Sequence, residues 1–209
     1  RRRPGSRCGV PVTPSTRAEC GLTLIELLAG VGLAAVLALA GGVQLRVGLD
    51  EYRARGAARY MAGRFNHART EAVARSASTA VRFSPVGSSY AFATFADGDR
   101  DGVLATDIQM GTDLQIGPID ALSLQFAGVD FGVMADVPSA DGTPLGTAEP
   151  VRFGASRMVV FTANGTATPG SLYIRGDRGA QYVVRVYGDT GKAQALRFDA
   201  RRRLWVALW

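Results

Sequence analysis

An apolar run from Leu22 to Leu45 most strongly limits what this chain can fold into. The run holds 24 residues, and Glu26 is the only charged residue in it. A helix of that length would span about 36 Å at about 1.5 Å per residue, which is enough to cross a bilayer. A carboxylate surrounded by hydrocarbon is costly unless it has a partner, so Glu26 requires an explanation.

The positive charge of the chain is concentrated ahead of this run. Residues 1–21 carry five arginines and one acid, Glu19, which accounts for +4 of the net charge of +6. The positive-inside rule therefore predicts a cytoplasmic N-terminus and an exported remainder. Both cysteines, Cys8 and Cys20, also lie in this segment. If the segment is removed, no thiol remains for redox chemistry or a thiolate zinc site.

Two other kinds of export segment compete with a membrane anchor. Ala38-Leu39-Ala40 at the end of the run resembles the cleavage site of a secretory signal peptide. Glu26 counts against this reading, because a discarded peptide gains nothing from a charge in its apolar region. A lipoprotein anchor requires a cysteine at the end of the apolar stretch, whereas Cys20 precedes it.

The hexapeptide GLTLIE at residues 21–26 resembles the processing site of type IV prepilins and type II secretion pseudopilins. The resemblance implies that residues 1–21 are a basic leader, that prepilin peptidase cuts after Gly21, and that Leu22 becomes N-methylated. Most members begin the mature chain with Phe or Met, so Leu22 departs from the pattern. Glu26 would be the fifth mature residue, and its carboxylate would pair with the α-ammonium group of a neighbouring subunit. The alternative is a glutamate that reaches the membrane interface.

A helical pattern continues beyond the apolar run, through residues 46–78. Apolar side chains recur at spacings of three, four and seven residues, which is typical of one face of an amphipathic helix. They are Leu49, Tyr52, Tyr60, Met61, Phe65, Ala68, Ala72 and Val73. We therefore expect one helix from about Leu22 to about Ala77, with 22–45 as its transmembrane and assembly half. Gly48, Gly56 and Gly63 indicate local bends or close packing within it.

Residues 79–209 have the pattern of a β-rich periplasmic domain. The expected strands are Thr79–Phe83, Tyr90–Phe95, Leu122–Phe126, Arg157–Thr162, Leu172–Arg175, Gln181–Tyr187 and Ala193–Phe198. Short turns join the last four, which predicts an antiparallel meander. Residues 127–150 are rich in Gly, Pro and Asp and indicate a long, weakly ordered excursion. The fold class is α+β, with a long, partly transmembrane N-terminal helix packed on an antiparallel β domain.

Two stretches of this domain narrow the resemblance. MVVFTANGTATPGSLYI and YVVRVYGDTGKAQALRF resemble the strand–turn–strand ending of the GspH/FimT family of pseudopilins and minor pilins. Gly191-Lys192-Ala193 stands where that family commonly has Gly-Arg-Val. The resemblance implies a pilin-like fold and assembly with other pilins or pseudopilins. It does not separate a type II secretion pseudopilus from a type IV pilus.

The sequence DGDRDGVLATD at residues 97–107 predicts a cation site. Asp97, Asp99 and Asp101 alternate ahead of a glycine, as in an EF-hand loop, where such carboxylates converge on one Ca²⁺. The Val103 carbonyl is the expected backbone ligand. Asp107 would replace the usual closing acid, which comes one residue later. The alternative is an acidic hairpin loop without a metal.

The basic C-terminal end suggests a second possible partner. Arg201, Arg202 and Arg203 lie close to Trp205, and such groups can bind phosphates and stack on bases. Some FimT-type minor pilins bind DNA through a basic C-terminal region, so the resemblance implies this alternative function. The other interpretation is a final strand, Leu204–Leu208, with solvated arginines beside it.

Catalytic motifs are absent from the sequence. It contains no G-x-S-x-G, H-E-x-x-H or P-loop motif, and His67 is its single histidine. We therefore expect a structural subunit, with no required cofactor apart from a possible structural Ca²⁺. Its expected partners are other pilins or pseudopilins, prepilin peptidase and the inner-membrane assembly platform. Its expected location is the inner membrane as a single-pass protein, with the C-terminal domain in the periplasm, assembled in a filament or its initiating tip complex.

Overall fold

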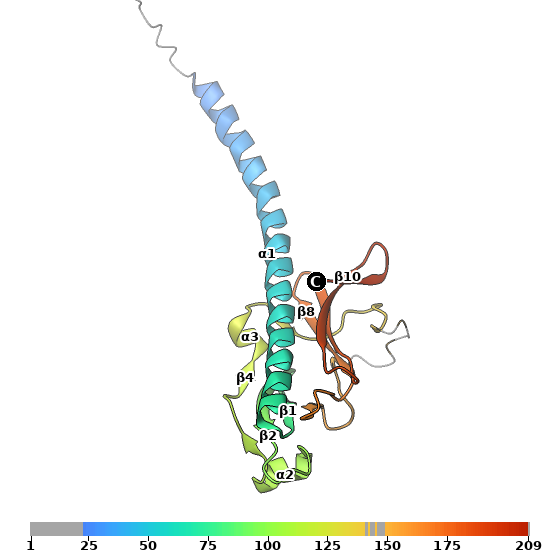
Figure 1. Ribbon diagram of the computed structural model, residues 1–209. Coiled ribbons are helices and arrows are strands. Elements are labelled where there is room, and N and C mark those ends of the chain that lie inside the picture. Colours follow the sequence, from blue (N-terminus) through green and yellow to red (C-terminus); the bar gives the residue numbers. More distant parts are fainter. Residues whose placement is uncertain (1–22, 141, 143–144, 146–148, 209) are drawn as a thin grey trace, which may run out of the picture. The chain divides into compact units, whose positions relative to one another are not determined.

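The computed structural model describes residues 23–140, 142, 145 and 149–208 (Figure 1). The chain divides into two compact units, one ending at Gly42 and the other running from Val43 to Trp209. The described part of the first unit is the beginning of helix α1. The second unit contains the rest of α1 and all the strands.

Helix α1 runs from Leu24 to Arg75, close to the predicted range of 22–77. The helix ends where Ser76 adopts a left-handed backbone conformation with φ of 51°. The next N–H, that of Ala77, donates to the carbonyl of Ala72, which satisfies one of the last free carbonyls of the helix.

Two antiparallel sheets form the β domain. The first has the order β3-β2-β1-β7, with β4 also pairing with β2, and the second has the order β11-β10-β9-β8-β5, with β6 also pairing with β8. The first contains β1 (Thr79–Val86), β2 (Ser89–Ala96), β3 (Leu114–Gln115), β4 (Asp120–Ala121) and β7 (Met158–Phe161). The second contains β5 (Val129–Phe131), β6 (Val151–Arg152), β8 (Gly170–Gly176), β9 (Gln181–Val186), β10 (Ala193–Asp199) and β11 (Leu204–Ala207). Two short helices, α2 (Ala105–Met110) and α3 (Leu122–Gln125), lie in the connections after β2 and β4.

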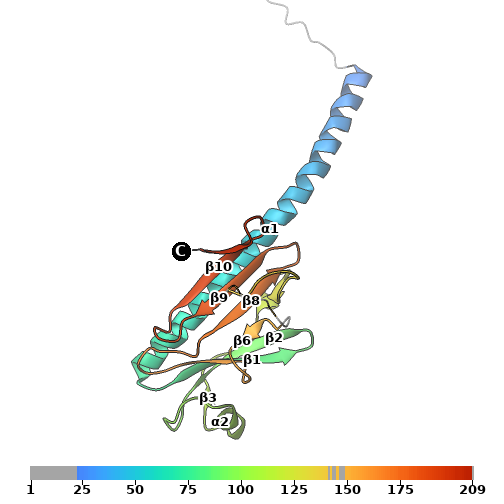
Figure 2. The same ribbon diagram turned by 90° about the vertical axis from the view of Figure 1, so that its right-hand side faces the viewer.

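The core lies between the second half of α1 and the inner faces of both sheets. Figure 2 shows β8, β9 and β10 running beside this part of the helix. Phe65 of α1 is fully buried, and its ring contacts those of Phe83, Phe153 and Phe161 at centroid distances of 6.2, 5.7 and 6.3 Å. One helix side chain thus joins aromatic residues from several parts of the β domain.

The face of α1 that is buried differs in part from the predicted one. Met61, Phe65, Ala68 and Ala72 are buried as expected. Small side chains make up most of the rest of the buried face, namely Ala54, Ala57, Ala58 and Ala62. Leu49, Tyr52 and Val73 are exposed, so their assignment to this face was wrong. The prediction followed the largest apolar side chains, whereas close approach of a helix to a sheet requires the smallest.

The three glycines of the second half of the predicted helix do not share one role. A Cβ added to Gly56 would lie 3.1 Å from the Phe126 ring, so this glycine permits close packing. Nothing lies within 4 Å of a Cβ added to Gly48 or Gly63. The prediction of close packing therefore holds at Gly56 alone.

The predicted meander is displaced by one strand. Strands β8, β9, β10 and β11 form the meander, whereas Met158–Phe161 pairs with β1 in the other sheet. The turn at residues 162–166 does bring the chain back beside β7, where Ala167 forms a single antiparallel bridge with Phe161, but the next strand, β8, then lies in the second sheet. The prediction counted turns along the sequence, and a turn does not show in which sheet the next strand lies.

Two further predictions about the β domain were wrong. Leu122–Gln125 is a helical turn rather than a strand, and the Phe126 N–H donates to the Leu122 carbonyl. Only Leu122 of this turn is buried, so the turn lacks the alternation of a strand. Within the supposed excursion of residues 127–150, Val129–Phe131 forms β5 and pairs with β8. Val129 and Phe131 anchor this segment because their side chains reach the core.

Candidate functional site

Thr23 and Glu26 form a reciprocal cap at the start of α1. The Glu26 carboxylate accepts hydrogen bonds from the Thr23 N–H at 3.3 Å and the Thr23 hydroxyl at 3.1 Å. The Glu26 N–H in turn donates to the Thr23 hydroxyl oxygen at 3.3 Å. This capping box satisfies N–H groups that have no partner within the helix. The T-x-x-E spacing was visible in the sequence, but this role was missed. The predicted cleavage site, Gly21 and Leu22, lies outside the described residues.

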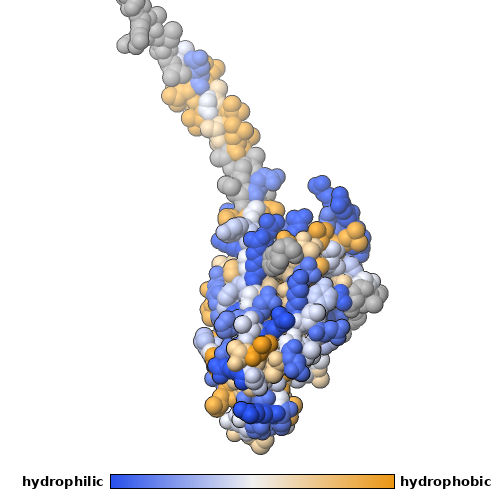
Figure 3. All heavy atoms as spheres, viewed as in Figure 1, coloured by the Kyte–Doolittle hydropathy of each residue, from blue (hydrophilic) through white to orange (hydrophobic). Residues whose placement is uncertain are grey.

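The first turns of α1 expose large apolar side chains on all sides. Figure 3 shows orange side chains on the face of this part of the helix that is turned to the viewer. Their exposed fractions range from 54% at Leu27 to 78% at Leu24. The others are Ile25, Leu28, Val31, Leu33, Val36 and Leu37. Contiguous apolar surface of this kind marks a place where another protein or a lipid binds. Within the part of the chain that the structure describes, no helix combines the length and the apolar character needed to cross a membrane.

The structure brings together three of the predicted metal ligands. Asp97, Asp99 and Asp101 follow β2 and each place a carboxylate oxygen within 4.8 Å of the other two. Asp97 also holds the loop in shape, because it accepts hydrogen bonds from the N–H groups of Arg100 at 2.6 Å and Gly102 at 3.0 Å. Gly102 has a φ of 107°, a conformation that suits glycine.

The charges of this loop act on one another. The pKa of Asp101 is raised, first by its hydrogen bond with the Asp99 side chain and then by desolvation. The negative charges of Asp99, Asp107 and Asp97 raise it further. The four carboxylates therefore form one electrostatic group.

The two remaining predicted ligands lie on the inner side of the loop. Val103 is buried beside Ala80 and Met158. Asp107 lies in the first turn of α2, is only 8% exposed, and its Oδ2 atom has no hydrogen-bond partner. The predicted closing acid is thus in a helix, and it is not among the acids whose carboxylate oxygens lie within 4.8 Å of one another.

Asp113 is a fifth acid of this region, and it was missed. It is 2% exposed, and its two oxygens accept hydrogen bonds from the N–H groups of Gly98 at 3.1 Å and Leu104 at 3.0 Å. These bonds tie the beginning and the end of the acidic loop to a single buried side chain. In the sequence, only its position directly after Gly111-Thr112 could have indicated that Asp113 takes part in a turn.

The basic C-terminal residues lie on the hairpin between β10 and β11. Arg201, Arg202 and Arg203 are exposed, and Arg203 donates to the Asp136 carbonyl at 3.0 Å. Trp205 has a structural environment: its indole N–H donates to the carbonyls of Pro138 and Ser139, and its ring packs on Tyr173 and Phe198. Arg202 also lies 4.0 Å from the Asp199 carboxylate, so two of the three arginines have partners within the chain, and the predicted stacking residue is part of the fold.

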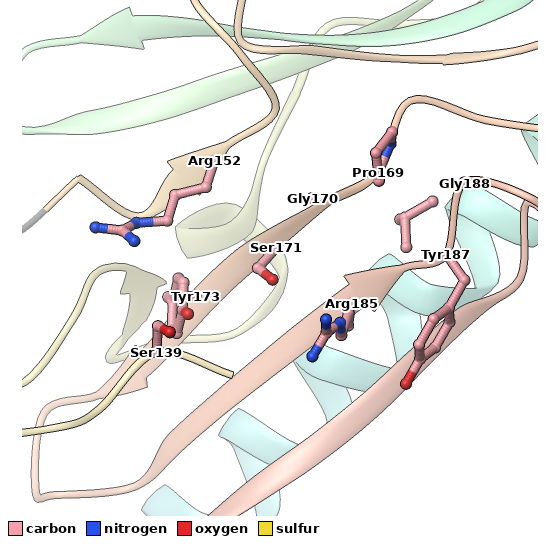
Figure 4. Close-up of a pocket in the computed structure, with 10 residues that line it drawn as sticks. Ser139, Arg152, Pro169, Gly170, Ser171, Tyr173, Arg185, Tyr187 and Gly188 are labelled. Carbon is pink, nitrogen blue, oxygen red and sulfur yellow. The ribbon is translucent and has the colours of Figure 1, made fainter. Parts of the chain in front are cut away.

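A pocket of about 370 Å³ lies on the outer face of the second sheet (Figure 4). Arg152 and Arg185 lie on either side of Ser171 in this view. Arg185 donates to the Ala140 carbonyl at 3.1 Å and lies over the Tyr187 ring, with 5.5 Å from Cζ to the centroid. Among the described lining residues there is no Asp, Glu, His or Cys, so the pocket offers no ordinary general base. His67 lies elsewhere, exposed on α1 and 3.6 Å from Glu71.

Two acids of α1 connect the helix to the second sheet, and both were missed. Asp50 is 7% exposed, and its Oδ2 accepts the N–H groups of Arg178 at 3.1 Å and Ala180 at 3.2 Å in the β8–β9 turn. Glu51 accepts the Tyr182 hydroxyl at 2.5 Å and the Arg197 guanidinium at 3.2 Å. In the sequence, only the position of these two adjacent acids shortly after the apolar run could have indicated this role. The residues that Asp50 and Glu51 bond to lie more than a hundred positions later in the chain.

Comparison with known proteins supplies the family. No curated protein and no solved structure matches the chain. The family model described as type II transport protein GspH matches residues 57–191, which is more than half of the 209 residues. The match covers the last part of α1, from Ala57 onward, and both sheets as far as the β9–β10 turn. The chain therefore belongs to the GspH family of type II transport proteins.

Proposed function

We propose that the protein is a pseudopilin, a structural subunit of the filament that serves type II secretion, with a place in its initiating tip complex. Prepilin peptidase cuts it after Gly21, and Leu22 becomes the N-methylated first residue. Residues 22–45 anchor the subunit in the inner membrane, and the β domain lies in the periplasm. The family match supports the assignment to secretion, and the basic leader supports this orientation.

One observation carries the proposal, namely the exposed apolar surface of α1 that begins at a capped glutamate. The large side chains of Leu24, Ile25 and Leu28 are more than half exposed, and burying each fully stabilises a complex by about 1.5–3 kcal/mol. In the membrane, lipid covers this surface. In the filament, the helices of neighbouring subunits cover it.

Glu26 selects the neighbour. In the single subunit its carboxylate is bonded to Thr23. Cleavage after Gly21 would create an α-ammonium group on Leu22 of an adjacent subunit. The ammonium adds a direct charge–charge attraction that the neutral Thr23 hydroxyl cannot supply, so it can displace the hydroxyl. Each buried charge is then paired, which offsets its desolvation.

The proposal is tested by following processing and assembly in the host. We expect the mature protein from membranes to begin at N-methylated Leu22, as measured by intact mass and N-terminal sequencing. A chain that begins at Gly41 would instead indicate a cleaved signal peptide and contradict the proposal. Replacing Gly21 should leave the leader attached.

The role of Glu26 is tested by Glu26→Gln, with Glu71→Gln as the matched control. Glu71 is also on α1, and its carboxylate bonds to Arg75 at 2.7 Å. We expect Glu26→Gln to remain in the membrane fraction but to be lost from cross-linked pseudopilin complexes, because the neighbour's ammonium has no charged partner. Glu71→Gln should assemble normally. Equal incorporation of the two variants would exclude the pairing.

A further inference from the structure

Strand β10 carries the basic turn after it to the end of the domain at which α1 enters. The Ala193 N–H donates to the Asn66 side chain at 3.4 Å. Four residues later, the Arg197 guanidinium lies 3.2 Å from the Glu51 carboxylate, so the strand runs towards the beginning of α1. Asp199, its last residue, lies about 7 Å further on at about 3.3 Å per residue. Figure 1 and Figure 2 both show the turn after β10 level with the first turns of α1 that belong to the second unit.

Other arginines gather at the same end of the domain. Arg46 and Arg53 of α1 and Arg178 of the β8–β9 turn are exposed, and they line a pocket of about 240 Å³. Asp50 and Asp177 also line it, but Asp50 is buried and accepts N–H groups of the β8–β9 turn. Together with the three arginines of the β10–β11 turn, six exposed arginines from three segments lie at this end.

The opposite end of the domain is acidic. The Asp97 N–H donates to the Ser78 carbonyl at 3.0 Å, just after α1 ends at Arg75. Residues 97–113 hold five aspartates and one arginine. Arg46 and Arg75 are about 44 Å apart along the helix at about 1.5 Å per residue. A negatively charged surface at the point where α1 enters would therefore attract the near end of the domain and repel the far end.

The β10–β11 turn combines its charges with exposed apolar side chains. Arg201, Arg202 and Arg203 are exposed, as the site description gives. Leu204 and Val206 follow on the edge strand β11 and are 60% and 45% exposed. Basic residues beside apolar ones are typical of segments that lie at the surface of an anionic bilayer, where the charges bind phosphates and the apolar groups reach the acyl chains.

Nucleic acid suits this turn less well than lipid. Binding of single strands relies on aromatic rings on which bases stack. The ring of Trp205 already packs on Tyr173 and Phe198. The exposed apolar side chains beside the arginines are aliphatic, and they offer a base no aromatic surface.

We propose that the basic end of the domain docks on anionic phospholipid headgroups of the membrane that holds α1, with the β10–β11 turn as the main contact. The proposal rests on the proposed function, because it requires residues 22–45 to be in the membrane. That segment ends one residue before Arg46, so the chain leaves the bilayer at the end of the domain where the arginines lie. The anchor raises the effective concentration of lipid at the turn, so individually weak contacts suffice. Docking holds the unassembled subunit with its acidic loop away from the lipid.

The test uses the full chain in lipid nanodiscs, with its own tryptophans as the probe. Trp205 lies in β11 and Trp209 follows four residues later, and the sequence has no other tryptophan. Quenching of their fluorescence by brominated acyl chains is compared in discs of phosphatidylcholine alone and in discs of equal parts phosphatidylcholine and phosphatidylglycerol. We expect stronger quenching in the anionic discs. Raising the salt from about 0.1 M to about 1 M should abolish the difference, because the Debye length falls from about 10 Å to about 3 Å.

A double variant, Arg201→Gln with Arg202→Gln, removes two charges from the turn. Arg203 is kept because its φ is 53° and its side chain donates to the Asp136 carbonyl. In anionic discs, the ratio of docked to undocked domain should fall about thirtyfold, which corresponds to about 2 kcal/mol at about 1 kcal/mol per arginine.

The matched control removes the same charge from the other end of the domain. It combines Arg75→Gln, in the last turn of α1, with Lys192→Gln, in the β9–β10 turn that also carries the exposed Asp189. This control should be quenched as the wild type is. Equal quenching of the control and the Arg201→Gln, Arg202→Gln variant in anionic discs would overturn the proposal.

The outcomes separate the docking from the anchor. If the protein stays with the discs in high salt but is quenched equally in neutral and anionic discs, the anchor holds and the docking is overturned. If the protein leaves the discs in high salt, the proposed membrane anchor is overturned, and the docking with it. Binding of single-stranded DNA through Arg201 and Arg202, without any effect of lipid charge on quenching, would assign the turn to nucleic acid instead.

Discussion

At the start of α1, the Glu26 carboxylate bonds to Thr23 of its own chain, although the sequence suggests a role between chains. The cap and the proposed role are compatible, because the cap belongs to the single subunit and the proposed pairing to the assembled one. A capping box stabilises a helix end by satisfying free N–H groups. Before assembly, the Glu26 carboxylate therefore already accepts two hydrogen bonds from Thr23, although its charge has no charged partner among the ion pairs of the described residues.

Asp50 shows how a single side chain can hold a helix against a distant turn. Its Oδ2 accepts the N–H groups of Arg178 and Ala180, and a Cβ added to Gly176 would lie 2.3 Å from its Oδ1. Asp50→Asn keeps the shape but removes the charge. We expect a loss of about 1.5–3 kcal/mol in the free energy of unfolding, the range for hydrogen bonds to charged groups. Urea denaturation in detergent measures this loss, with Asp189→Asn as the control. Equal midpoints for the two variants would show that the two bonds contribute nothing to stability.

At the scale of the element, the alanine face of α1 determines how close the helix lies to the sheets. Ala58 is completely buried, so Ala58→Leu inserts atoms where no space exists. Overpacking of this kind typically costs about 1–3 kcal/mol, and we expect a lower urea midpoint. Ala74→Leu on the exposed side of the same helix should change stability by less than about 0.5 kcal/mol. If Ala58→Leu had as small an effect as Ala74→Leu, the close approach described here would be wrong.

The elements also show what a sequence can and cannot reveal. The extent of α1 and the strands from β8 to β10 follow from local patterns, because periodicity and turn residues act over a few positions. The acidic loop was predicted for the same reason, since its three aspartates lie at alternate positions. The placement of Met158–Phe161 beside β1 depends on contacts between distant segments. So do the bonds of Asp50 to the β8–β9 turn and the packing of Trp205 on Tyr173.

At the scale of the whole domain, the raised pKa of Tyr182 makes the stability of the domain fall at alkaline pH. Burial, and then the hydrogen bond to Glu51, raises the pKa of Tyr182 to about 12. An unfolded tyrosine loses its proton near pH 10. As the pH rises from about 10 to about 12, the unfolded state therefore binds fewer protons than the folded state, and the domain loses stability.

The matched variants for this effect are Tyr182→Phe and Tyr52→Phe. Tyr52 lies exposed on α1. In urea titrations between pH 8 and pH 11.5, a window that brackets the unfolded pKa of about 10, Tyr182→Phe should lose less stability than the wild type. Tyr52→Phe should follow the wild type. If all three proteins showed the same slope, Tyr182 would not be the group responsible.

The pairing of β1 with β7 has a consequence for the time at which the domain can form. Thr79 follows directly after α1, yet its partner on this edge is Phe161, and the second sheet is completed only by β11. A chain that is exported with its helix first therefore delivers the alanine face and Phe65 long before the strands that cover them. Contacts between such distant residues form slowly, and exposed apolar surface during this interval promotes aggregation. In such a chain, the β1–β2 hairpin can pair early, but both sheets are complete only after β11 has been exported.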